Sequence, residues 1–98
     1  KAIAEALPES KLEHLNLNSN QIKDEGLETI CSVLPSSEVV FLRLADNLIG
    51  NKGAESLVSA LKASKLKSVD LSSNQIRSRM KKFMDGFATS LEINLIYL

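Results

Sequence analysis

Residues 12–22 read LEHLNLNSNQI, and the same pattern returns twice, as VVFLRLADNLI at 39–49 and as LKSVDLSSNQI at 66–76. Each copy begins 27 residues after the one before it, and the aliphatic positions and the asparagine coincide in all three. The aliphatic spacing begins a fourth time at Ile93. Repetition at a fixed period of this length is typical of a solenoid, in which each repeat buries its apolar face against its neighbours.

Each copy of the motif predicts a short strand followed by a helix. Leu15 and Leu17 lie two residues apart and therefore share one face of a strand, while the residues between them face the other side. The asparagine that follows can both donate to and accept from backbone groups where the chain leaves the sheet. We expect its copies to form a buried polar ladder of Asn20, Asn47 and Asn74. Apolar residues at helical spacing then return the chain to the next strand.

The pattern also predicts where the helices and the repeats begin. Asp24, Asn51 and Ser78 are residue types that cap helices, and each stands just before an apolar helical pattern, so we expect them at helix N-termini. Residues 1–11 fit the helical half of a preceding repeat. Residues 1–98 are therefore expected to form a single repeat domain, or a fragment of a longer array, with repeats that start near 12, 39, 66 and 93.

The three motifs match the pattern L-x-x-L-x-L-x-x-N-x-L and thereby resemble the leucine-rich repeat family. With the helical segments GLETICSVL (26–34) and GAESLVSAL (53–61), the chain is similar to the ribonuclease-inhibitor-like subclass. The resemblance implies an α/β leucine-rich repeat solenoid, a right-handed βα superhelix with a short parallel sheet on the concave side and helices on the convex side. The segment at 20–27, NQIKDEGL, is also similar to the cysteine-containing repeats of F-box proteins, but asparagine stands where those repeats carry cysteine.

The functions of this subclass suggest what the chain does. It includes ribonuclease inhibitor, the sensing regions of NOD-like receptors, the Ran GTPase-activating protein and effectors of intracellular bacteria, and most members bind other proteins through the concave sheet. The resemblance therefore implies a non-enzymatic module for protein–protein interaction, a scaffold for a protein partner. The alternative is a GTPase-regulatory or host-directed effector protein, and a third interpretation is a purely structural spacer.

Strand alternation predicts which side chains the concave face would offer to a protein partner, because they stand between the buried aliphatic residues. They are His14, Asn16, Asn18, Phe41, Arg43, Ser68, Asp70, Ser72, Leu95 and Tyr97. The expected rows across neighbouring strands read Asn16, Arg43, Asp70, Tyr97 and His14, Phe41, Ser68, Leu95.

Four of these residues are candidate anchors for a partner. Aromatic residues and arginine contribute strongly to interface energy, which favours Phe41, Arg43 and Tyr97, with Leu95 beside them. Arg43 and Asp70 are expected to be neighbours. The alternative interpretation is that this pair neutralises itself at the surface, where it would contribute about 0–1 kcal/mol, and that Leu95 and Tyr97 are covered by the next repeat.

The third repeat departs from the other two. Met80 stands at the position of the aligned glycines and Lys81 at an apolar position. The segment also carries a basic cluster of Arg77, Arg79, Lys81 and Lys82. We interpret the cluster as the solvated side of an ordinary helix, because charge runs are usually solvated faces. The alternative is a convex basic patch that contacts an acidic protein, a phospholipid or RNA.

Composition argues against several classes of function. Twelve basic and twelve acidic residues balance, so no net field favours nucleic acid or an anionic membrane, and no apolar run is long enough to span a bilayer. The single histidine and the single cysteine, Cys31, offer no zinc-ligand spacing. We therefore expect no catalytic, cofactor-binding or metal-binding residues and no enzymatic activity. The lone cysteine in an apolar helical pattern predicts a buried thiol and an intracellular, cytoplasmic protein.

The ends of the repeat array show no evident polar cap in the sequence. Solenoids need covered terminal faces, and an uncovered final strand carries unpaired backbone groups. We therefore expect self-association through uncapped ends, or reliance on neighbouring repeats.

Overall fold

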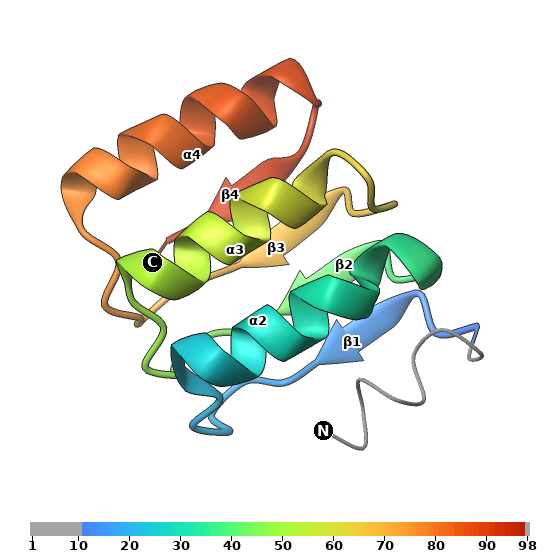
Figure 1. Ribbon diagram of the computed structural model, residues 1–98, viewed down its shortest axis with the longest axis horizontal. Coiled ribbons are helices and arrows are strands. Elements are labelled where there is room, and N and C mark those ends of the chain that lie inside the picture. Colours follow the sequence, from blue (N-terminus) through green and yellow to red (C-terminus); the bar gives the residue numbers. More distant parts are fainter. Residues whose placement is uncertain (1–10, 98) are drawn as a thin grey trace.

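The computed structural model describes residues 11–97, in which short strands alternate with helices (Figure 1). The elements follow in the order β1 (His14–Asn16), α2 (Lys23–Val33), the 3-10 turn η2 (Leu34–Ser36), β2 (Phe41–Arg43), α3 (Asn51–Leu61), β3 (Ser68–Asp70), α4 (Ser78–Ser90) and β4 (Asn94–Ile96). These strands lie parallel in one sheet in chain order, and the helices cover one face of it. The predicted α/β repeat solenoid is confirmed. Residues 1–10, on which most of the expected preceding helix falls, and Leu98 lie outside the described residues.

The core lies between the sheet and the helices. Leu42 and Val69 point inward from the middle of their strands, and Leu57 and Met84 meet them from the helices. All four are almost completely buried, and each such side chain stabilises the fold by about 1.5–3 kcal/mol through its removal from water. Because every repeat supplies the same positions, the core runs continuously from one repeat to the next.

The first three strands pair in the predicted register. His14 lies beside Phe41, and Phe41 beside Ser68, one 27-residue step apart each time. The last strand differs, because Ser68 pairs with Asn94 rather than with Leu95. The repeat step is therefore one residue shorter at β4.

The predicted placement of Leu95 and Tyr97 on the open face of the sheet is consequently wrong. A slip of one residue turns every side chain of a strand to the opposite face, so Leu95 and Tyr97 pack against the core while Ile96 faces the open side. The sequence could not decide between the two registers, because apolar residues or tyrosine occupy every position at 95–98. Packing against the helices decides it instead.

The side chain of Asn47 connects neighbouring repeats where the chain leaves the sheet. Its Oδ1 accepts hydrogen bonds from the backbone N–H groups of Asn20, at 2.8 Å, and Ile22, at 3.2 Å. Its Nδ2 donates to the carbonyl oxygens of Leu17, at 2.8 Å, and Ala45, at 3.1 Å. The residue is fully buried, so one amide satisfies backbone groups that the sheet leaves unpaired.

Asn74 repeats this arrangement one step further along. Its Oδ1 accepts from the N–H groups of Asn47 and Ile49, at 2.9 and 3.0 Å, and its Nδ2 donates to the carbonyl oxygen of Leu44 at 2.8 Å. Asn20, in the first described repeat, is exposed and donates within its own repeat. The predicted asparagine ladder is therefore confirmed for Asn47 and Asn74, but the prediction that Asn20 is a buried member of it is wrong.

The prediction that Asp24, Asn51 and Ser78 cap helices is wrong. All three lie inside the first turns of α2, α3 and α4, whose N-termini carry no side-chain cap. Asp24 Oδ1 instead accepts from the N–H of Gly50 at 2.7 Å, and Asn51 Oδ1 accepts from the N–H of Arg77 at 3.0 Å. Gly50 and Arg77 directly precede α3 and α4, so each oxygen holds the start of the next repeat's helix.

The glycine at the start of α3 sets how closely the helices pack. A Cβ atom at Gly53 would lie 2.6 Å from Asp24 Oδ1 and 3.2 Å from Asp24 Cα, which leaves no room for a side chain. Met80 stands at the equivalent position in α4. Figure 1 shows α4 set further from α3 than α3 is from α2.

The far side of α4 is polar where the equivalent sides of α2 and α3 are apolar. Leu27 and Ala54 are fully buried at the position that Lys81 occupies in α4. Val58, buried in α3, corresponds to Asp85, which is exposed. The side of α4 that faces away from α3 therefore carries charged side chains in place of apolar ones.

Tyr97 closes the core beneath this polar side. Its hydroxyl lies 3.7 Å from Met84 Sδ, and Lys81 Nζ lies 5.2 Å from the centre of its ring, within the range of a cation–π interaction. Burial, and then the negative charge of Asp85, raise the pKa of Tyr97 above its ordinary value of 10.0. Lys81 and Asp85 therefore give this side of α4 a polar character that was not predicted from the sequence, and self-association stays a prediction.

A hollow of about 430 Å³ lies beside α2. Its lining combines Leu17, Ile22 and Ile30 with the polar residues Asn20, Lys23, Glu25 and Thr29. Self-association stays a prediction for this side.

Replacing Asn47 with alanine is expected to lower the free energy of unfolding by about 3 kcal/mol, because buried backbone groups lose their partners. Replacing the exposed Asn20 with alanine should lower it by less than about 1 kcal/mol. Urea unfolding followed by circular dichroism measures both changes. Equal losses in the two variants would show that the buried amide is not the link between repeats.

The double change Lys81→Leu and Asp85→Val would give α4 the residue types of the preceding helices on its far side. We expect this variant to self-associate, because it places apolar side chains where Lys81 and Asp85 now meet water. Sedimentation velocity measures the change. Arg79→Leu with Lys82→Val, at exposed positions elsewhere on α4, is the matched control, and a Lys81→Leu, Asp85→Val variant no more associated than this control would contradict the prediction.

Candidate functional site

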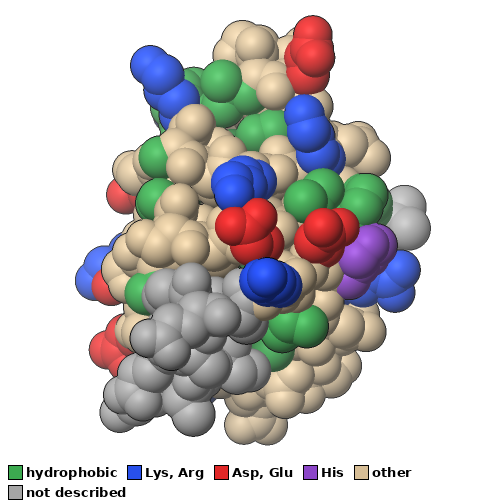
Figure 2. All heavy atoms as spheres, turned by 90° about the vertical axis from the view of Figure 1, so that its right-hand side faces the viewer, with side chains coloured by type: hydrophobic (Ala, Val, Ile, Leu, Met, Phe, Trp, Pro, Cys, Tyr) green, Lys and Arg blue, Asp and Glu red, His purple; other side chains and the backbone are tan. Residues whose placement is uncertain are grey.

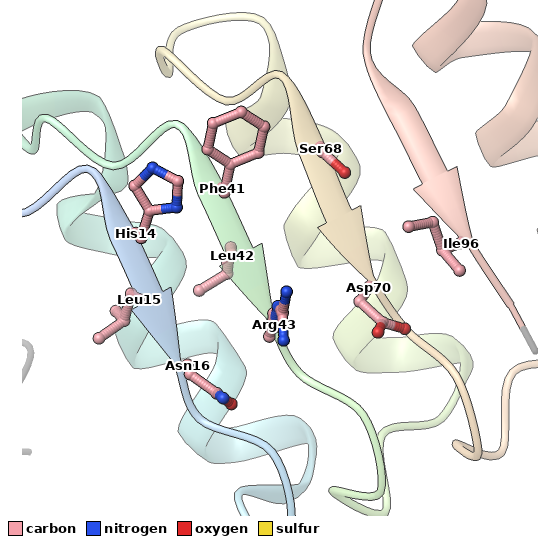
Figure 3. Close-up of a pocket in the computed structure, with 9 residues that line it drawn as sticks. All are labelled: His14, Leu15, Asn16, Phe41, Leu42, Arg43, Ser68, Asp70 and Ile96. Atoms are coloured by element: carbon pink, nitrogen blue, oxygen red, sulfur yellow. The ribbon is translucent and has the colours of Figure 1, made fainter.

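A groove of about 670 Å³ lies on the open face of the sheet, on the side away from the helices (Figure 3). All of its lining residues belong to strands: His14, Leu15, Asn16, Phe41, Leu42, Arg43, Ser68, Asp70 and Ile96. The predicted site residues that it brings together are His14, Asn16, Phe41, Arg43, Ser68 and Asp70. Parallel pairing in register therefore gathers most of the predicted surface into one place.

One part of the groove is aromatic. The rings of His14 and Phe41 lie side by side on β1 and β2, with their centres 4.6 Å apart and their planes inclined by 32°. Phe41 keeps 42% of its surface exposed. A large apolar side chain left in water at the centre of a sheet gains free energy when another surface covers it.

The charged part of the groove contains Arg43 and Asp70. They lie opposite each other on β2 and β3, as predicted, but within residues 11–97 no ion pair joins them. Asp70 Oδ1 accepts hydrogen bonds from the hydroxyl of Ser72, at 2.6 Å, and from its backbone N–H, at 3.0 Å. Arg43 is exposed. Arg43 and Asp70 therefore do not form the self-neutralising ion pair that the alternative interpretation expected.

Four predicted site residues lie outside the groove. Asn18 Oδ1 accepts a hydrogen bond from the N–H of Ala45 at 2.8 Å, so this side chain connects two repeats. Ser72 is 8% exposed, and its hydroxyl donates a hydrogen bond to Asp70 Oδ1. Leu95 and Tyr97 pack against the core.

Three lining residues are not among the predicted site residues: Leu15, Leu42 and Ile96. The sequence places the first two at the aliphatic positions that face the core, so Ile96 is the one whose face it did not predict. It enters the groove because β4 is shifted by one residue. Its only signal in the sequence is the unbroken apolar run at the end of the chain, which suits either register equally.

The edge of the molecule where helices end and strands begin carries charges of both signs. Figure 2 shows acidic and basic side chains interspersed on this side. Lys65 Nζ and Glu38 Oε1 form an ion pair there at 2.9 Å, with about half of each side chain exposed. Such a pair contributes about 0–1 kcal/mol, and the mixture of signs gives this edge no strong field.

The basic cluster of the third repeat lies mostly in water. Arg77, Arg79 and Lys82 are exposed, and Lys81 is half-buried over the ring of Tyr97. Three of the four side chains are thus placed as a solvated helix face would place them.

The thiol of Cys31 lies in the core, as predicted. Burial, and then the neighbouring Glu28, raise its pKa from 9.0 to about 12. Among residues 11–97, no group of three or more histidine, cysteine, aspartate and glutamate side chains is placed to hold a metal ion. No helix in this part of the chain is long and apolar enough to cross a membrane.

Because the pKa of Cys31 is raised in the folded state, the fold is expected to lose stability at alkaline pH. The folded thiol stays protonated up to about pH 12, whereas the unfolded thiol ionises above pH 9.0, so its contribution is complete below pH 9 and falls as the pH rises. Relative to Cys31→Ala, the chain should lose about 1 kcal/mol of unfolding free energy between pH 8 and pH 10. Urea unfolding at both values measures it, and an unchanged difference would contradict the burial of the thiol.

Comparison with known families agrees with this geometry. The chain matches the model of a family described as Leucine Rich repeat over residues 10–31, 39–58 and 62–79, which is more than half of its length. No curated protein sequence matches it significantly. The first two matched segments each contain a strand and most of the helix that follows it, and the third contains β3 and the first two residues of α4. The chain therefore belongs to the leucine-rich repeat family, whose repeats generally mediate protein–protein interactions.

Proposed function

We propose that this chain is a non-enzymatic protein-binding module, a scaffold that holds a protein partner on the open face of its sheet. The observation that carries the proposal is the exposure of Phe41 and Arg43 in the groove, two residues apart on the interior strand β2. Aromatic residues and arginine dominate interface energy when they are central and become covered. Pairing of β2 with both neighbouring strands holds the backbone of Phe41 and Arg43 in place, so little backbone conformational entropy is lost on binding.

We further propose that the chain belongs to the ribonuclease-inhibitor-like subclass and acts inside the cell, in the cytoplasm. The support for the subclass is that full α-helices of 11, 11 and 13 residues follow the successive strands. The support for the location is the single, buried thiol of Cys31, a state that suits a reducing compartment.

Regulation of a GTPase, or an effector role toward a host protein, is the alternative proposal. The exposed guanidinium of Arg43 favours it, because an arginine delivered to a partner's active site must be free of a fixed acidic partner. Stimulation of GTP hydrolysis that is lost in Arg43→Ala would support this alternative over a purely binding role.

Two matched double variants test the binding face. Phe41→Ala with Arg43→Glu changes the groove, whereas Phe83→Ala with Arg79→Glu removes the same residue types from exposed positions on α4. We expect proteins captured from cytosol, identified by mass spectrometry, to be lost with the groove variant and kept with the α4 variant, because only the first removes the anchors.

Circular dichroism checks that both variants stay folded. Partners lost only with the α4 variant would reject the groove and point to the basic third helix. Partners kept by both variants would reject either surface as the binding site.

A further inference from the structure

The chemistry of the partner follows from how the two charged residues of the groove are held. Arg43 and Asp70 are neighbours on β2 and β3, and a neutralised pair would give the groove no preference for charge. Asp70 is already bound, because its Oδ1 accepts from the hydroxyl and the N–H of Ser72, at 2.6 and 3.0 Å. Ser72 is itself buried, so the packing around it fixes the position of its hydroxyl and N–H groups. The carboxylate of Asp70 is therefore held by hydrogen bonds from Ser72, in the segment that directly follows β3.

Arg43 is left as the cation of the groove. Its side chain is exposed, and no ion pair between it and Asp70 is present among the described residues. A surface that covers Phe41 must also take water from Arg43, which lies two residues along the same strand. Covering an unpaired charge is unfavourable unless the partner supplies the opposite charge. A carboxylate fits best, since it accepts two parallel hydrogen bonds from a guanidinium.

The apolar part of the groove fixes what must accompany that carboxylate. Phe41 and Arg43 are alternate residues of β2, so their side chains leave the sheet roughly 6.6 Å apart. The ring of His14 lies against Phe41 at 4.6 Å, and Ile96 lines the groove from β4. An aliphatic or aromatic side chain matches this surface.

We propose that the groove binds a protein segment that sets a carboxylate against Arg43 and an apolar side chain against Phe41; this rests on the protein-binding function proposed above. Residues three or four apart on a helix, with side chains roughly 5–6 Å apart, or alternate residues of an extended segment span the required distance. The charge of Asp70 beside Arg43 weakens the attraction and limits the affinity.

A displayed library of random peptides, selected on the immobilised full chain, tests the proposal without an assumed ligand. We expect selected peptides to share an aspartate or glutamate with an apolar residue two to four positions away. For one such peptide, affinity measured by fluorescence anisotropy should fall about tenfold in Arg43→Gln. It should fall equally when the peptide's acid is replaced by its amide, with little further loss when both changes are combined.

Arg79→Gln is the matched control, because it removes an exposed arginine from α4 instead of the groove. Its affinity for the peptide should equal that of the unchanged chain. The same loss in both arginine variants would mean that the peptide senses overall charge rather than Arg43, and would overturn the proposal.

Asp70→Asn gives a test of opposite sign. The change keeps the size of the side chain and removes the negative charge beside Arg43, so the affinity for the acidic peptide should rise about threefold or more. Weaker or unchanged binding would overturn the inference that the ligand sets a carboxylate against Arg43 and that the charge of Asp70 opposes it.

The outcomes separate this inference from the proposed function. Peptides that depend on Phe41, shown with Phe41→Ala, but carry no acid or ignore Arg43→Gln would overturn the carboxylate inference and leave the binding groove in place. A selection without any peptide that depends on Phe41 would overturn both. Urea unfolding midpoints for every variant distinguish lost binding from lost folding.

Discussion

The buried amide of Asn47 is the interaction on which the rest of the structure depends. Strands of three residues cannot hold a sheet together alone, and the chain leaves each of them through an irregular bend. At that bend backbone N–H and C=O groups turn away from the ladder, and an unpaired buried group costs about 1–3 kcal/mol. One asparagine accepts twice and donates twice, and so ties its own repeat to the preceding one.

The candidate binding surface is a consequence of this regular stacking. Once repeats are tied in register, alternate strand residues form rows across the sheet, and Phe41 and Arg43 come to lie between the side chains of both neighbouring strands. Register alone would also bring Arg43 and Asp70 together as an ion pair. The bend after β3 prevents this, because Ser72 offers Asp70 two donors of its own. The segment that follows a strand therefore has two effects: it connects neighbouring repeats, and after β3 it binds Asp70, so that Arg43 has no ion pair with Asp70.

The third repeat shows how few substitutions change a solenoid unit. Met80 stands where the earlier repeats have glycine, and α4 lies further from α3 than α3 does from α2. Lys81 and Asp85 replace buried apolar residues on the far side, and the shortened step into β4 turns Tyr97 inward beneath them. These changes lie close together in the structure, because Lys81 contacts the ring of Tyr97 and Asp85 raises the pKa of its hydroxyl.

The sequence by itself determined the order of strands and helices, the 27-residue step between the first three strands, the ladder at Asn47 and Asn74, and the neighbourhood of Arg43 and Asp70. Each of these follows from local spacing, which the 27-residue repetition fixes without reference to distant residues. Only the tertiary structure decided the register of β4, since Leu95 and Ile96 suit the core equally well and packing chooses between them. It also decided that Asp24 holds the next repeat rather than its own helix, because a carboxylate bonds to the nearest unpaired donor, and folding determines which donor that is.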